Sequence, residues 1–419
     1  MNERFTTMRA LNGSLAEALN MIDPSMENHH QQTAYLSYMI ARAADFNEHA
    51  LALTRTAALT HDIGLITTEK TTDISESKKN AEQMAQFSAD IIEEFLDSAE
   101  VANIVRYCHS SWSKYLSYTK EEQGKYCESA RIATVVHLAD TVSTMLKADV
   151  SVLNQAKEIR ETISTLRDKE FSAEAVDAFL RASENEFIWL DLRYNPQFLN
   201  FFVGDIEAVS LDRTVKMTAI MSYIIDFHSS FTAMHSAGVA ASASELARLA
   251  GMSEDECKMM KIAGQLHDVG KLRVPRTILE KPDKLTEEEF NIIKEHPYYT
   301  RLNMMNVEGF EKIRNWAGYH HEKLNGRGYP FHLNASSLDT GSRIMAVADI
   351  FSAISEKRPY REGMNSEQVL KELNNKVRLQ EIDGDIVTLL AEHFEETERL
   401  RENASKSEVK RYYETINKI

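Results

Sequence analysis

The second half of this sequence concentrates histidines and aspartates, the residue types that bind divalent metals. The seven candidate ligands are His235, His267, Asp268, His296, His320, His321 and Asp349. Imidazole and carboxylate groups suit borderline ions such as iron, manganese, nickel, cobalt and zinc. Because a carboxylate has two oxygens, Asp268 can bridge two ions, and such a pair can generate hydroxide from a bridging water and hold a phosphate for in-line attack. These residues predict phosphodiester hydrolysis without a protein nucleophile.

Each of these histidines also has an ordinary interpretation. A single histidine at a helix end is more often structural or exposed than a ligand, and an adjacent His-Asp pair adds little by itself. Here the pair lies within LHDVGK, and the other histidines include those of EHP and HHEKLNGRGYP. Seven ligand-type residues in this setting favour a metal site over unrelated histidines.

These motifs, followed by VADIFSAISEKRPYR, resemble the HD-GYP family over residues 220–400. Members of that family hydrolyse cyclic dinucleotides, chiefly cyclic di-GMP and in some members cyclic GMP-AMP. The resemblance implies an all-α HD fold, a cyclic dinucleotide as substrate and the linear dinucleotide as product. It also implies a centre of two or three divalent ions, usually iron or manganese, with nickel compatible with the same ligands.

The resemblance also implies roles for individual residues. The first metal would be held by His235, His267, Asp268 and Asp349. The second would be held by Asp268, His296, His320 and His321. Asp268 and Lys271 would be the catalytic residues, with Lys271 near the scissile phosphate. The substrate pocket would be formed by Lys271, Arg327 and the GYP loop, which contains Gly328, Tyr329 and Pro330.

Three positions depart from the family pattern. Phe231 stands where some members have a glutamate that supports a third metal, so we expect two ions. Asn325 replaces the usual aspartate before the glycine of the GYP loop, and Thr300 replaces a common glycine after the His-Pro motif. The metal ligands are unaffected, so these changes bear on the shape and base preference of the pocket.

The chain also resembles itself. The shift that places His29 on His235 places His61-Asp62 on His267-Asp268 and Gly64 on Gly270, without a gap. Later stretches repeat in the same order, with Ala139-Asp140 resembling Ala348-Asp349. We therefore expect two tandem HD-type helical domains, a degenerate one in residues 1–205 and a catalytic one in residues 215–419.

The first copy has lost part of the ligand set. It retains His29, His61, Asp62 and Asp140, which could hold one metal ion. Leu65 stands at the position of the lysine, Cys108 at that of His320, and the partner of His296 is missing. The internal repeat aligns His30 with Ser236, so His30 is interpreted as a non-ligand. We expect a regulatory or dimerisation domain, with a residual single-metal site left open.

Helices must position these side chains. Alanine, leucine, glutamate, lysine and methionine dominate, whereas glycine (15) and proline (7) are scarce, which predicts an all-α fold. Apolar residues follow helical spacing in 30–44 and 236–250. Gly251 is a suitable C-cap, and Ser253 with Glu256 forms a capping box that opens the helix leading to His267-Asp268. Thr286 and Glu289 repeat this signal, and NGRGYP is expected to form a loop.

Composition excludes several classes of protein. A net charge of −16 argues against binding to duplex nucleic acid. The three cysteines are widely spaced, without a disulfide framework. The sequence shows neither a signal-peptide pattern nor an apolar run of membrane-spanning length. We expect a cytoplasmic protein without a membrane partner, which could form a homodimer or bind another protein through its first domain.

Two alternatives to a cyclic dinucleotide phosphodiesterase stay open. The chain could be a non-catalytic module that senses nucleotides, although such a module does not need seven ligands. It could also be an HD phosphohydrolase that acts on another nucleotide. This alternative stays open because Asn325 departs from the family pattern.

Overall fold

The computed structural model is almost wholly helical, as the sequence predicts. The residues it describes are 5–22, 28–64, 74–96, 98–118, 127–194, 207–228, 235–356 and 363–416. The only strands in these ranges are β1 (Thr6–Thr7) and β2 (Ala208–Val209), which pair antiparallel. Within the same ranges, no helix combines the length and the apolar character needed to cross a membrane.

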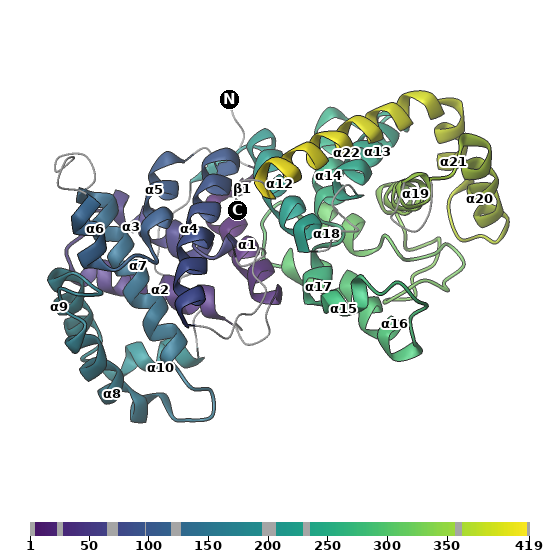
Figure 1. Cartoon of the computed structure of the whole chain (residues 1–419). Helices are drawn as coiled ribbons and strands as arrows, with labels where there is room; N and C mark the ends of the chain where they lie inside the picture. The colour runs from purple at the N-terminus through teal and green to yellow at the C-terminus, as the bar shows by residue number, and fades with distance from the viewer. Residues whose placement is uncertain are drawn as a thin grey trace. The chain divides into compact units, whose positions relative to one another are not determined.

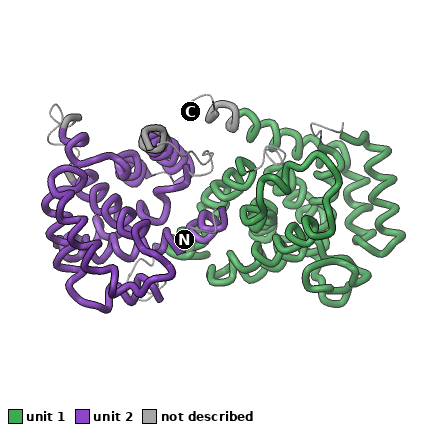
Figure 2. Tube along the Cα trace, turned by 60° about the horizontal axis from the view of Figure 1, so that its bottom comes forward, with its two compact units in different colours: residues 1–14, 208–419 green, residues 15–207 purple. Residues whose placement is uncertain are grey.

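The chain divides into two compact units (Figure 2). Unit 1 comprises Met1–Ser14 and Ala208–Ile419, and unit 2 comprises Leu15–Glu207. Helix α1 (Met8–Ile22) begins in unit 1 and ends in unit 2. The other helices of unit 2 (Figure 1) are α2 (His29–Ala43), α3 (Glu48–Thr60), α4 (Ile74–Leu96), α5 (Ala99–Tyr107), α6 (Trp112–Tyr118), α7 (Cys127–Met145), α8 (Val152–Thr165), α9 (Ala173–Ala182) and α10 (Glu186–Tyr194).

Unit 1 contains the later helices and a short 3-10 helix, η5. They are α12 (Leu211–His228), α13 (His235–Leu249), α14 (Glu254–Leu266), η5 (Val269–Arg273), α15 (Arg276–Leu279), α16 (Glu287–Lys294), α17 (His296–Asn303), α18 (Glu311–Gly318), α19 (Thr340–Ser355), α20 (Ser366–Arg378), α21 (Gly384–Glu392) and α22 (Phe394–Ile416).

The first residues of the chain differ from their expected assignment. The sequence pattern placed them in the N-terminal domain of residues 1–205, but they pack with unit 1. Thr6 pairs with Val209, and the rings of Phe5 and Phe310 lie 5.9 Å apart. The Ser14 hydroxyl donates a 2.7 Å hydrogen bond to Asn303 Oδ1. These contacts join segments far apart in sequence, which a local helical pattern does not reveal.

Close packing of α13 on α14 brings the predicted ligands together. Gly264 of α14 lies against the backbone of Ala240 on α13, and a side chain at this glycine would collide with it. His235 is the first residue of α13, and His267 directly follows α14. The capping box of Ser253 and Glu256 opens α14 as predicted. The approach of the two helices therefore places both histidines at one end of the pair.

Other predicted end signals are confirmed. Gly251 follows α13 with a φ of 80°, and Met252 N donates to Ala247 O at 3.0 Å. Thr286 and Glu289 form the capping box of α16. These capping signals fix where α14 and α16 begin. The next elements along the chain, η5 and α17, carry predicted site residues.

Candidate metal centre

The seven predicted ligands converge inside unit 1, and all but Asp349 lie at helix ends or directly after them. His235 and His296 begin α13 and α17, and His267 and Asp268 lie between α14 and η5. His320 and His321 follow α18, whereas Asp349 projects from α19. All are buried except His321, whose side chain is 28% exposed. The structure thus brings together a full set of residues drawn from five helices.

The first ligand group surrounds the start of α13. The ligand atoms of His235, His267 and Asp268 all lie within 4.8 Å of one another. His235 Nε2 lies 3.0 Å from Asp349 Oδ1, and His267 Nε2 lies 3.8 Å from the same oxygen. His267 Nε2 is also 3.4 Å from Asp268 Oδ2. These four residues match the first predicted metal position.

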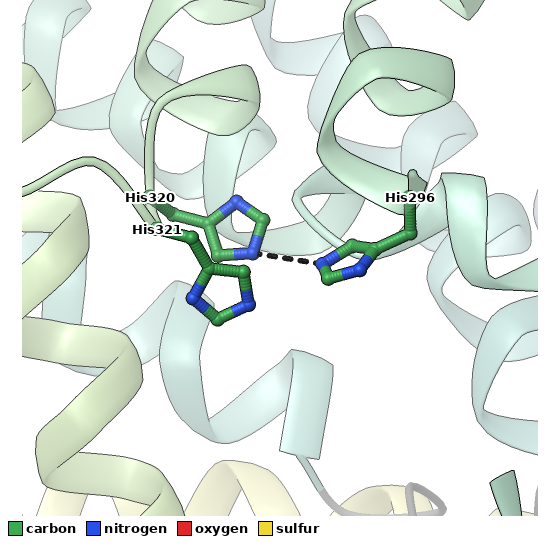
Figure 3. Close-up of side chains that lie close together, drawn as sticks. All are labelled: His296, His320 and His321. Carbon is green, nitrogen blue, oxygen red and sulfur yellow. Dashed lines mark hydrogen bonds between the residues drawn. The ribbon is translucent and has the colours of Figure 1, made fainter. Parts of the chain in front are cut away.

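The second group consists of His296, His320 and His321, whose rings face one another (Figure 3). Their ligand atoms also lie within 4.8 Å of one another, and the Nε2 atoms of His296 and His320 are 3.2 Å apart. Asp268 Oδ1 lies 3.3 Å from His296 Nε2. Since Asp268 Oδ2 faces His267, the two oxygens of this carboxylate point toward different ligand groups.

Backbone carbonyls orient three of the imidazole rings. The Nδ1 atoms of His267, His296 and His320 lie 2.8, 2.6 and 2.6 Å from the carbonyl oxygens of Gly264, Ile293 and Ala317. Because a carbonyl only accepts, each Nδ1 must carry the proton and donate, which leaves a lone pair on Nε2. This orientation is typical of metal-binding histidines.

Several inward atoms then lack a protein partner. With both Nδ1 atoms protonated, the Nε2 lone pairs of neutral His296 and His320 face each other at 3.2 Å. His267 Nε2 and Asp268 Oδ1 are buried and form no hydrogen bond in the part of the chain that the structure describes. Such atoms are costly unless something binds them. A divalent cation in each ligand group would satisfy them, so the residues fit a metal centre.

The charge states also suit metal binding. Burial lowers the pKa of His296 and, more strongly, that of His320. Burial, assisted by His296, lowers the pKa of His321 to about 3. Burial alone would raise the pKa of Asp268, but His267 and Lys271 hold it well below its usual value. Near neutral pH the second ligand group therefore presents neutral imidazoles beside the ionised carboxylate of Asp268, the forms that bind metal.

Glu356 is a functional residue that the sequence analysis missed. Its buried carboxylate oxygens lie 3.2 and 3.3 Å from His235 Nδ1. Glu356 follows α19 two helical turns after Asp349, so both residues lie on one side of this helix. That spacing was the available signal. A carboxylate bonded to Nδ1 fixes the ring and raises the basicity of Nε2.

Replacing Glu356 with glutamine is expected to weaken metal binding about 10- to 100-fold, because the neutral amide no longer supports His235 as a ligand. The measurement is the apparent Kd from a metal titration followed by activity and thermal stability. Glu245→Gln is the matched control, since Glu245 is a buried carboxylate of α13 that pairs with Arg248. Equal shifts in both variants would contradict a specific role for Glu356.

Lys271 and Thr300 lie beside the turn that carries Asp268, the carboxylate that faces both ligand groups. Lys271 Nζ lies 2.5 Å from Asp268 Oδ2. Gly270 N donates to the Thr300 hydroxyl at 3.0 Å, and this hydroxyl donates to His267 O at 2.9 Å. Thr300, a departure from the family pattern, therefore joins the His-Asp turn to α17. Gly270 lies so close to His296 O that a side chain there would collide.

The GYP loop packs against the second ligand group. Glu322 is buried and accepts hydrogen bonds from Phe331 N and Leu333 N at 2.7 and 2.8 Å, which holds the loop. The Tyr329 ring lies 4.8 Å from the ring of His321. Gly328 packs on the backbone of Glu322, where no side chain would fit.

The remaining loop positions lie farther out. Arg327 is exposed, and it lines a cleft together with Gly328, Tyr329 and Pro330. Asn325 Nδ2 donates to Leu379 O at 2.9 Å, and its Oδ1 accepts from Arg327 N at 3.0 Å. Asn325 thus shapes the loop. Phe231 lies outside the described residues.

Unit 2 contains one comparable group. The ligand atoms of His29, His61, Asp62 and Asp140 lie within 4.8 Å of one another. His61 Nδ1 donates to Ala58 O at 2.9 Å, as His267 does to Gly264 in unit 1. The Nε2 atoms of His29 and His61 are buried without a hydrogen bond in the described part of the chain. These residues fit a single ion.

Two further histidines of unit 2 lie beside this group. His109, which follows Cys108 as His321 follows His320, has its Nε2 3.1 Å from Asp62 Oδ1. The neighbouring His30 is buried, with Nδ1 2.5 Å from Asn20 Oδ1. The residue that replaces it in unit 1, Ser236, makes the corresponding bond to Asp226 Oδ1 at 2.7 Å.

Among the residues of unit 2 that the structure describes, the second ligand group has no complete counterpart. Gly64 packs against the backbone of Met84 and donates to Ser88 Oγ at 2.8 Å, as Gly270 packs against His296 and donates to Thr300. Met84 therefore occupies the place of His296, an equivalence that the sequence alone did not show. Cys108 is buried at the position of His320. Leu65, the counterpart of Lys271, lies outside the described residues.

Comparisons with known proteins agree with this geometry. Models of the HD domain match residues 26–145 and 219–386. The chain is 27% identical to 3'3'-cGAMP-specific phosphodiesterase 1 of Vibrio cholerae, across 91% of this chain and 90% of that protein. It is 31% identical to a cyclic di-GMP phosphodiesterase of Thermotoga maritima, across 39% of this chain and 45% of that protein.

A solved structure shares the fold. It is a crystal structure of a cyclic GMP-AMP-specific phosphodiesterase from V. cholerae, with a TM-score of 0.65 and 21% sequence identity. The match covers 93% of this chain and 98% of that one.

Proposed function

The chain contains two HD domains in tandem, and we propose that the second is a metal-dependent phosphodiesterase that hydrolyses a cyclic dinucleotide to the linear dinucleotide. The observation that carries this proposal is the position of Asp268. Its two carboxylate oxygens face separate groups of imidazole Nε2 atoms, at 3.4 Å for His267 and 3.3 Å for His296. This arrangement suits two ions that act on one phosphate.

Each group of residues has a distinct part in the proposed reaction. When bound, two divalent ions would activate water and neutralise charge on the phosphate. His235, His267, Asp268 and Asp349 would hold the first ion. Asp268, His296, His320 and His321 would hold the second. The Lys271 ammonium, beside Asp268, would neutralise charge on the phosphate or donate a proton to the leaving 3′ oxygen.

The similarity along nearly the whole chain to a 3'3'-cGAMP-specific enzyme supports 3′,3′-cyclic GMP-AMP as the preferred substrate. Cyclic di-GMP is the second candidate, supported by the relative from T. maritima. Iron and manganese are the proposed metals, because a set of imidazoles and carboxylates suits them. Unit 2 is proposed to be a degenerate HD domain with one ion, acting in regulation or dimerisation.

The test is an assay of the purified protein loaded with Fe(II) or Mn(II). We expect it to convert cyclic GMP-AMP or cyclic di-GMP to the linear dinucleotide, as resolved by chromatography, with metal content measured on the same sample. Intact substrates in a sample with occupied metal sites would refute the proposal. Tight nucleotide binding without turnover would instead support a sensing module.

A further inference from the structure

A cleft outside the ligand groups has the chemistry of a nucleotide site. It has a volume of about 850 Å³ and lies between the GYP loop and helices α16 and α17. Its lining includes four phenylalanine and tyrosine side chains, Phe290, Tyr298, Tyr299 and Tyr329, and three cationic ones, Lys294, Lys323 and Arg327.

Tyr329 joins this cleft to the metal centre. Its ring lines the cleft and also lies 4.8 Å from the ring of His321. On the other side, the cleft-lining Glu295 directly precedes His296. A molecule bound by a phosphate at the metal centre would therefore extend into the cleft.

The aromatic side chains of the cleft are exposed rather than packed in the core. Phe290 is 43% exposed and Tyr298 is 50% exposed. The Phe290 ring lies 6.2 Å from that of Tyr329, and the Tyr298 ring lies 6.5 Å from that of Phe331. Exposed aromatic rings grouped in a hollow favour a flat apolar ligand, and nucleobases stack on such rings.

The three cations of the cleft differ in their pairing with carboxylates. Lys323, which also lines the cleft, pairs with Glu381 at 2.7 Å. Lys294 and Arg327 have no carboxylate partner among the residues that the structure describes. Lys294 Nζ instead lies 5.4 Å from the centre of the Phe290 ring. Two unpaired cations beside stacking surfaces suit a ligand that is both aromatic and anionic.

We propose that this cleft binds the half of the cyclic dinucleotide that is not being cleaved. Its base would stack on Phe290 and Tyr298, and its phosphate would meet Arg327 and Lys294. The inference rests on the proposed function and adds to it, because it assigns substrate recognition to α16 and α17. Both ligand groups would hold the ions that act on the scissile phosphate, whereas these side chains select a dinucleotide over a simple phosphodiester.

The test compares two substrates in metal-loaded full-length protein. One is 3′,3′-cyclic GMP-AMP, and the other is methyl p-nitrophenyl phosphate, a diester without a nucleobase. For Phe290→Ala we expect the KM for the dinucleotide to rise about tenfold, in line with the loss of one base-stacking contact. The ratio of kcat/KM for the dinucleotide to kcat/KM for the small diester should fall by a similar factor. Phe290→Tyr, which keeps the ring, should restore most of this ratio.

Phe187→Ala is the matched control, because Phe187 is 49% exposed on α10 of unit 2. It should leave the ratio unchanged. An unchanged ratio in Phe290→Ala would overturn the inference while the proposed function stands, and so would a ratio that the tyrosine variant fails to restore. A wild type that cleaves the small diester but neither cyclic dinucleotide would instead refute the proposed function.

Discussion

Replacing Asp268 with alanine is expected to lower turnover of the cyclic dinucleotide by at least about a thousandfold and to release metal from unit 1. The carboxylate faces both ligand groups, so its loss weakens both ion positions at once. Ions at such a centre contribute several kcal/mol to stabilising charge in the transition state, and each 1.36 kcal/mol corresponds to about tenfold in rate. Turnover and metal content measured on the same preparation check this expectation.

The internal repeat supplies the control for this variant. Asp62→Ala makes the same exchange at the equivalent position of unit 2, where the residue lies in the single group of possible ligands. It should remove metal from unit 2 only and leave turnover within about twofold of the wild type. Thermal unfolding of both variants separates loss of metal from loss of fold. Equal loss of activity in the two variants would reverse the proposed assignment of the units.

The sequence predicted a candidate ligand set, whose members the fold brings together, because metal-binding residues are marked by type as well as by position. The His-Asp pair, the His-Pro motif and the paired histidines each follow a helix or begin one, so helix-end signals such as the Ser253 capping box also indicate where they lie. Helical periodicity then predicted the all-α fold. Both kinds of signal are local, and for that reason they can be read from one chain.

The features that escaped prediction depend on contacts between distant segments. Glu356 supports His235 across the interface of α13 and α19, and its spacing from Asp349 does not by itself show which histidine it meets. Phe290 and Tyr298 occur in TEEEFNIIKEHPYY as ordinary helix residues, and only the folded chain shows that they share a cleft with Tyr329. The antiparallel pairing of β1 with β2 was not predicted, for the same reason.

The two units show which parts of the site the fold itself requires. In both, a glycine after the His-Asp pair packs against the backbone of the following helix, beside His296 in unit 1 and Met84 in unit 2. A hydroxyl, of Thr300 or Ser88, accepts the hydrogen bond of that glycine in each unit. The backbone contact persists although the side chain changes from imidazole to thioether. The packing of this turn therefore does not depend on the second ligand group.

Lys271→Met is expected to lower kcat about 10²- to 10³-fold, the usual cost of removing one group that stabilises charge on the reacting oxygens. Lys271 Nζ lies 2.5 Å from Asp268 Oδ2, and its side chain is 21% exposed, so it can reach both the bridging carboxylate and a bound phosphate. It is not among the ligand groups, and the variant should therefore retain metal. Lys271→Arg keeps the charge and should recover part of the lost rate.

The same variant should also change the pH profile. Burial raises the pKa of Asp268, whereas His267 and Lys271 lower it well below its usual value. Without the ammonium group this pKa rises, so Asp268 becomes protonated, and metal is lost, at a higher pH than in the wild type. The acid limb of the activity profile should therefore move toward neutral pH in Lys271→Met and stay near its wild-type position in Lys271→Arg. A methionine variant that loses its metal at every pH would show that Lys271 maintains the ligand geometry rather than acting on the phosphate.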